Sequence, residues 1–189
     1  MRILAIETSC DDTGVAILNV SKDGNFKILS NIVSSQIEVH KKYGGVYPAL
    51  AKREHQKNLV PVLLQALREA KILNPKHKIP NPQKIPDTKR HILNTILERE
   101  LELQKQLIPF LEKYEKPAVD VIAVTSGPGL EPCLWVGVNF ARALSCFWDI
   151  PTVEVDHIKA HIFVTALNNG KTIEDLSKKG FPALCLVVS

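Results

Sequence analysis

The sequence predicts an α/β fold built around one sheet. Three apolar runs joined by short polar turns open the chain, and strand and helix patterns alternate after residue 118. A chain of 189 residues with 45% apolar and 23% charged side chains is ordinary for a globular protein with a buried core.

No apolar run approaches the roughly 18 residues that cross a bilayer, and Glu7 interrupts the first run too early for a signal peptide. The four cysteines are far apart in the sequence, so we expect reduced thiols and a cytoplasmic location without membrane contact.

The first half of the chain predicts strands followed by helices. Residues 2–8, 13–20 and 26–35 form three apolar, partly β-branched runs, which predict an antiparallel meander. Apolar residues at three- and four-residue spacing predict a helix over 48–70, which Pro61 should bend or break. Four prolines predict an extended loop over 74–86, and residues 88–114 are again helical, with an interruption near Pro109.

The second half alternates strands and helices. We expect strands at 119–125 and 152–155, helices from Pro132 to about residue 147 and over 157–167, a polar connection at 168–180 and a further strand at 182–189. This order matches one lobe of the actin-like, sugar-kinase and Hsp70-type ATPase (ASKHA) fold. Residues 1–167 would form the N-terminal lobe with a helical, basic insertion at about 71–117. Residues 168–189 would form a connection and the first strand of a truncated second lobe, so we expect an N-terminal part of a longer protein.

The polar link between the first two strands is the first candidate site. It holds Ser9, Cys10, Asp11 and Asp12. Hydroxyls, backbone N–H groups and carboxylates at a sheet end can hold phosphates, transfer a proton or contact a metal. An ordinary polar turn explains the same residues.

His157 and His161 are the second candidate. Residues four apart lie on one helix face, so both imidazoles can bind one metal ion. Solvated surface histidines are the alternative. A zinc protease of the His-Glu pattern would need Glu after the first histidine, where this chain has Ile158.

Two glycine-containing turns precede helices. Gly127 and Gly129 lie between a strand and a helix, where backbone N–H groups favour anions, although by itself this pattern is better explained by a plain strand–helix turn. The segment 43–48 contains two tyrosines and two glycines ahead of Lys52 and Arg53, which could contact RNA or be ordinary surface charges.

The charge pattern indicates a polyanionic partner. Residues 71–90 contain one acid, Asp87, and six basic side chains: Lys71, Lys76, Lys78, Lys84, Lys89 and Arg90. Of these, Lys76, Lys78 and Lys84 are candidate contacts with such a partner. A solvated loop, or a partner docked on the apolar face of 92–111, would account for the same segment.

Four segments together resemble one family, the tRNA N(6)-adenosine threonylcarbamoyltransferases, formerly called O-sialoglycoprotein endopeptidases. They are ILAIETSCDDTGVAI, YGGVYPALAKREH, TSGPGL and RALSCFWDIPTVEVDHIKAHI. The resemblance covers the chain except about 71–117.

The resemblance implies an acyltransferase that moves a threonylcarbamoyl group from its adenylate to N(6) of the adenosine 3′ of the anticodon, in tRNAs that read codons beginning with A. It implies that His157 and His161 bind one Fe²⁺, or Zn²⁺, with a third ligand outside this chain, and that Asp11 is the catalytic carboxylate. Val187, Val188 and Ser189 would begin the substrate-binding strand. The implied partners are tRNA, threonylcarbamoyl-adenylate, a non-catalytic paralogue and an ATPase; the 189-residue part alone is expected to be inactive.

Three alternatives remain at this level. A metalloprotease would need a general base beside the histidines, the non-catalytic paralogue lacks the paired histidines, and a sugar or acetate kinase lacks the stretch 142–162.

Overall fold

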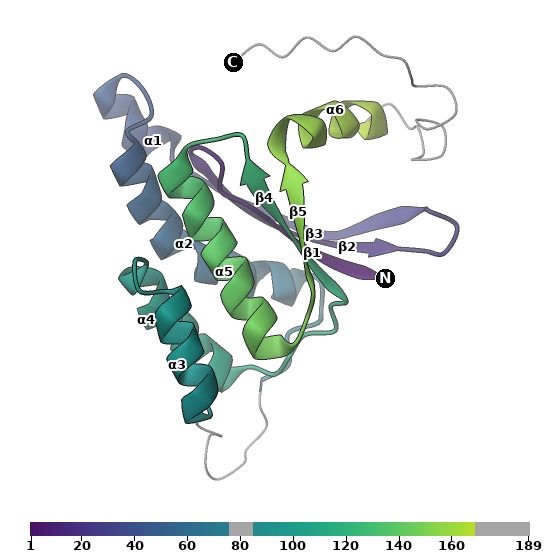
Figure 1. Cartoon of the computed structure of the whole chain (residues 1–189). Coiled ribbons are helices and arrows are strands. Elements are labelled where there is room, and N and C mark those ends of the chain that lie inside the picture. Colours follow the sequence, from purple (N-terminus) through teal and green to yellow (C-terminus); the bar gives the residue numbers. More distant parts are fainter. Residues whose placement is uncertain (76–84, 169–189) are drawn as a thin grey trace.

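Five strands form one mixed sheet. The computed structural model describes residues 1–75 and 85–168, with side chains as far as Val164 in the last helix. The strands are β1 (Arg2–Glu7), β2 (Asp12–Val20), β3 (Phe26–Ser35), β4 (Val121–Gly127) and β5 (Thr152–Asp156), in the order β3-β2-β1-β4-β5. The first three strands pair antiparallel, which confirms the predicted meander, while β4 is parallel to β1 and β5 is parallel to β4. The carboxyl ends of β1, β4 and β5 therefore meet at one end of the sheet (Figure 1).

Helices cover one face of the sheet in two layers. The long helices α2 (Pro48–Glu69) and α5 (Glu131–Trp148) pack on the sheet, and α3 (Asp87–Ile96) and α4 (Leu101–Lys113) pack outside them (Figure 1). Side chains alternate between the faces of a strand. The residues of β1 and β2 that face the helices are accordingly buried: Leu4, Ile6, Val15 and Ile17. Their neighbours Ala5 and Ala16 lie half-exposed on the opposite face.

The two internal prolines do not break their helices. A break at Pro61 and an interruption at Pro109 are both wrong, because α2 continues for 22 residues and α4 runs through Pro109. A proline deprives the carbonyl four residues earlier of its N–H partner. Both prolines are exposed, and so are Lys57 and Lys105 at those earlier positions, so water can hydrogen-bond the freed carbonyls. The interruption falls instead between α3 and α4, where the side chain of Glu100 is buried.

Short elements complete the fold. A helical turn, α1 (Ile37–His40), and a 3-10 turn, η1 (Lys41–Tyr43), join β3 to α2, and the sequence pattern predicts neither. Helix α6 (His157–Asn168) follows β5 directly, as predicted, and lies beyond the tips of β4 and β5 (Figure 1). The strand predicted at 182–189 and nearly all of the connection at 168–180 lie outside the described residues.

Two further predictions can be compared with the described residues. Cys10, Cys133 and Cys146 are free thiols. No helix in the described part of the chain combines the length and apolar character of a membrane span.

Candidate functional site

His157 and His161 face each other in the first turns of α6. Their Nε2 atoms are 3.1 Å apart, and the ring planes meet at 89°. Two imidazole nitrogens bound at about 2.0–2.1 Å to one tetrahedral ion would lie roughly 3.3 Å apart. The pair therefore fits two neighbouring positions around a single metal ion. Within 1–75 and 85–164, no third Cys, His, Asp or Glu joins the two histidines to form a metal-binding cluster. The third ligand of the metal ion therefore stays a prediction.

Glu7, the last residue of β1, faces the other ring nitrogen of His157. Its Oε2 lies 3.4 Å from Nδ1 of His157, and Oγ of Ser9 lies 3.1 Å from the same nitrogen. The Thr125 hydroxyl and the Ser9 backbone N–H donate to this carboxylate.

The negative charge of Glu7 favours the N–H of His157 at Nδ1, the ring nitrogen that faces the carboxylate. Burial raises the pKa of Glu7, but the hydrogen bonds from Ser9 and Thr125, with the nearby His157, outweigh it and lower the pKa overall. When the neutral imidazole donates its one N–H, at Nδ1, to this carboxylate, Nε2 is the nitrogen that can bind a metal. Our sequence prediction gave Glu7 no role in the site. The available signal was an acid at the end of an apolar strand.

A pocket of about 490 Å³ opens beside these residues. Its polar end is lined by Glu7, Asp12, Thr125 and His161. The rest is lined by Ala160 and Val164 of α6 and by the sheet face that α2 and α5 leave uncovered, whose small residues include Ala5, Gly14, Ala16 and Ala123. Its volume lies within the range of about 300–1,000 Å³ that small-molecule sites occupy.

The link between β1 and β2 brings Ser9, but not Asp11, to the histidine pair. Asp11 is half-exposed and Asp12 is exposed. No hydrogen bond among the described residues joins either carboxylate to His157. Partial burial, followed by the charges of Asp11 and Asp12, raises the pKa of the Cys10 thiol. Cys10 is therefore a protonated thiol at neutral pH and a poor nucleophile.

The turn between β4 and α5 packs directly on this link. The Leu130 N–H donates to the Ser9 carbonyl at 2.7 Å. A Cβ on Gly129 would lie 2.7 Å from that carbonyl oxygen, so only glycine allows the approach. Gly129 thus contacts the candidate site through the backbone of Ser9, while its predicted contact with a phosphate remains a prediction, as does that of Gly127.

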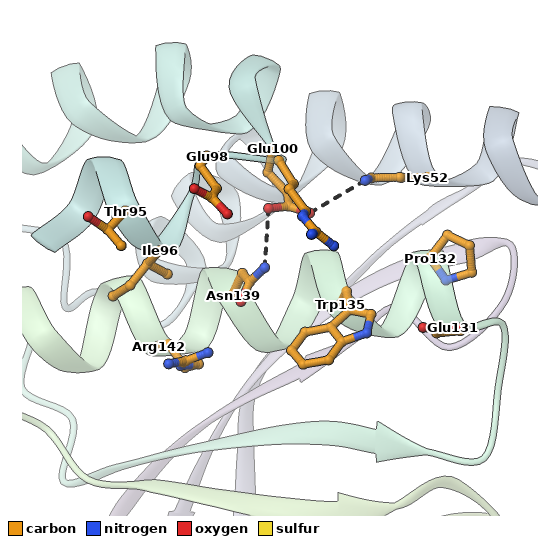
Figure 2. A pocket seen from close by; sticks show the side chains of 11 residues that line it. Lys52, Thr95, Ile96, Glu98, Glu100, Glu131, Pro132, Trp135, Asn139 and Arg142 are labelled. Atoms are coloured by element: carbon orange, nitrogen blue, oxygen red, sulfur yellow. Dashed lines mark hydrogen bonds and ion pairs between the residues drawn. The ribbon is translucent and has the colours of Figure 1, made fainter.

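Of the predicted tRNA contacts, the described residues include two. Nζ of Lys52 lies 3.5 Å from Oε1 of the buried Glu100, and Asn139 donates to Oε2 of the same carboxylate at 3.1 Å. Figure 2 shows these groups in a second pocket of about 440 Å³, between α2, the α3–α4 turn and α5. Lys52 therefore has a partner inside the protein, whereas Arg53 is exposed.

The other predicted site residues lie outside the described part of the chain. They are Lys76, Lys78, Lys84, Val187, Val188 and Ser189.

Comparison with known proteins decides the family. The family model described as tRNA N6-adenosine threonylcarbamoyltransferase (TsaD) matches residues 27–76 and 106–189. The chain belongs to this family. The resemblance in the sequence is thereby confirmed, and the unmatched stretch 77–105 falls within the predicted insertion. The threonylcarbamoyltransferases of Christiangramia forsetii and Bacillus subtilis are 38% and 37% identical to this chain over 189 residues.

The chain spans about two fifths of the length of these relatives. The alignments cover 100% of this chain, but 40% of the C. forsetii protein and 39% of the B. subtilis protein. A solved structure of YeaZ from Pseudomonas aeruginosa aligns with 82% of this chain and 45% of its own at 16% identity, with a TM-score of 0.43. That structural similarity is too weak to add to the assignment.

Proposed function

We propose that the complete protein transfers the threonylcarbamoyl group of threonylcarbamoyl-adenylate to N(6) of the adenosine 3′ of the anticodon, in tRNAs that read codons beginning with A. One observation carries the proposal. In a chain of this family, His157 and His161 bring their Nε2 atoms to 3.1 Å at the carboxyl end of β5.

The two Nε2 atoms would hold one Fe²⁺, or Zn²⁺, together with a third ligand from outside this chain. When bound, the ion would supply an electrophilic centre that positions and polarises the adenylate. Glu7 and Ser9 hold Nδ1 of His157, and so fix the direction in which its Nε2 points.

Asp11 would act as the general base. The exocyclic amine of adenosine is a poor nucleophile because its lone pair is delocalised into the ring. As the bond from N(6) to the carbamoyl carbon forms, the bond from that carbon to the phosphate oxygen breaks and AMP leaves with the electron pair. The Asp11 carboxylate accepts the proton that N(6) loses.

Different parts of the chain would bind the two substrates, the adenylate and tRNA. The pocket beside Glu7 and His161, with the link residues Ser9, Cys10 and Asp12, the turn of Gly127 and Gly129, and the segment 187–189, would bind the adenylate. The exposed Arg53 would bind tRNA phosphates, together with Lys76, Lys78 and Lys84, which lie outside the described residues.

The wider setting of the protein follows from the same proposal. We place the described sheet and its helices as the N-terminal lobe of an ASKHA fold, with residues 168–189 leading to a second lobe. The complete enzyme would work in the cytoplasm with a non-catalytic paralogue and an ATPase partner.

Variants of the complete protein test the proposal. Metal content is measured by elemental analysis, and modified adenosine in tRNA by mass spectrometry of nucleosides. His157→Ala should lose metal and tRNA modification together, while His91→Ala, at an exposed position on α3, should keep both. Asp11→Asn should lower turnover about 100- to 10,000-fold with adenylate binding retained. Full activity in His157→Ala would contradict the proposal.

A further inference from the structure

Three buried polar side chains form one connected network on the helix-covered side of the β1–β2 link. Gln36, His40 and His55 are 1%, 3% and 0% exposed. None of them contacts the pocket beside Glu7 and His161. Burial of polar groups is costly unless each is hydrogen-bonded, so their partners show what they hold in place.

The hydrogen bonds of His55 define its tautomer. Its Nε2 lies 3.0 Å from the carbonyl oxygen of Cys10, which can only accept, so Nε2 carries the proton. Its Nδ1 is then the acceptor, for the Thr13 hydroxyl at 2.8 Å and for the Gln36 amide at 3.4 Å.

The hydrogen bonds of His40 and Gln36 also pair each donor with an acceptor. Nε2 of His40 donates to Oε1 of Gln36 at 3.0 Å, and Nδ1 of His40 accepts the backbone N–H of Tyr47 at 3.3 Å. The backbone N–H of Gln36 donates to the Asp11 carbonyl at 3.0 Å. Each side chain thus has one consistent set of donors and acceptors, which is the arrangement that makes a buried network rigid.

The network ends on the two consecutive carbonyl groups beside the Asp11 side chain. The pairing of β1 with β2 stops at Glu7 and Gly14, so the carbonyls of Cys10 and Asp11 lie outside that ladder. The side chain of His55 holds the first, and the backbone N–H of Gln36 holds the second. Apolar side chains could fill the same volume without any desolvation cost, so packing alone does not account for three buried polar groups here.

We infer that His55, supported by Gln36 and His40, is a positioning residue. It holds the β1–β2 link, here called the Asp11 loop, in place so that the Asp11 carboxylate can accept a proton. The inference rests on the proposed function for its catalytic consequence, but not for the rigidity of the loop. Burial lowers the pKa of His55, against the opposing effect of the Cys10 carbonyl and the nearby carboxylates. The neutral Nε2–H form that the loop needs is thereby favoured.

Two amide substitutions separate positioning from packing. In His55→Gln, the terminal NH₂ reaches roughly where Nε2 lies and can still donate to the Cys10 carbonyl. In His55→Asn, which is shorter by one methylene, it cannot. Gln56→Leu is the matched control, because Gln56 is the next residue and is also buried, at 8% exposure, but its Oε1 accepts the backbone N–H of Glu102 in α4 instead.

The exposed Cys10 thiol reports the loop directly. In the complete protein, its rate of alkylation by a maleimide is followed by peptide mass spectrometry, alongside kcat and KM for tRNA. We expect His55→Asn to be alkylated several-fold faster and to lose about 10- to 100-fold in kcat with KM little changed. His55→Gln should recover both values, and Gln56→Leu should match the unsubstituted protein even if its melting temperature falls.

Each outcome bears on the inference. Equal alkylation rates in His55→Asn and His55→Gln, or an equal effect of Gln56→Leu, would overturn it. If the unsubstituted protein modified no tRNA, the proposed function would fail, while the alkylation rates would still decide whether His55 holds the loop.

Discussion

Replacing Glu7 by Gln should weaken metal binding although Glu7 does not itself reach the Nε2 atoms. The carboxylate accepts from the Ser9 N–H and the Thr125 hydroxyl and faces Nδ1 of His157. A glutamine has one acceptor oxygen for these three groups, and its NH₂ must face at least one donor. Loss of such an outer partner typically costs about 10- to 100-fold in metal affinity, which is about 1.4–2.8 kcal/mol.

Calorimetric titration of the metal-free complete protein with Zn²⁺ measures this change. Glu38→Gln is the control, because Glu38 is 84% exposed and its ion pair with Lys41 is on the surface. An unchanged Kd in Glu7→Gln would refute the role of Glu7 in holding His157. So would an equal loss of affinity in Glu38→Gln.

Three further results follow from the described geometry and the charge pattern. Gly129→Ala should destabilise the fold by about 1–3 kcal/mol in urea unfolding, because its Cβ would lie 2.7 Å from the Ser9 carbonyl. Gly45→Ala, with no atom within 4 Å, should have little effect. Since burial lowers the pKa of His55 below 6.5, only the unfolded state gains a proton just below pH 6.5, so stability should fall there, and less in His55→Gln. When Lys76, Lys78 and Lys84 are replaced by Gln, the plot of log K for tRNA binding against log salt concentration should become less steep. Each lost contact with a duplex phosphate should reduce the magnitude of the slope by about 0.9.

Much of the fold could be predicted because local patterns determine it. Apolar, partly β-branched runs between polar turns define β1 and β2, and the four-residue spacing of His157 and His161 is preserved because α6 begins at His157. The wrong predictions of a helix break at Pro61 and of an interruption near Pro109 have one cause. Sequence shows the missing N–H but not whether the freed carbonyl reaches water, and in both helices it lies on the exposed face.

The residues around the site were harder to predict because their partners are distant in sequence. Glu7 meets Thr125 and His157, and His55 meets Cys10, through contacts that only the assembled sheet and α2 create. The same applies to Lys52, whose pairing with Glu100 depends on the α3–α4 turn reaching α2. Residue type alone indicated a surface cation.

The most direct test of the account is anomalous diffraction at the metal edge from crystals of the complete protein grown with Fe²⁺ or Zn²⁺. We expect one anomalous peak about 2.0–2.1 Å from Nε2 of both His157 and His161. A metal peak elsewhere, with these two imidazoles bound to no ion, would contradict the central claim that the pair holds a single metal.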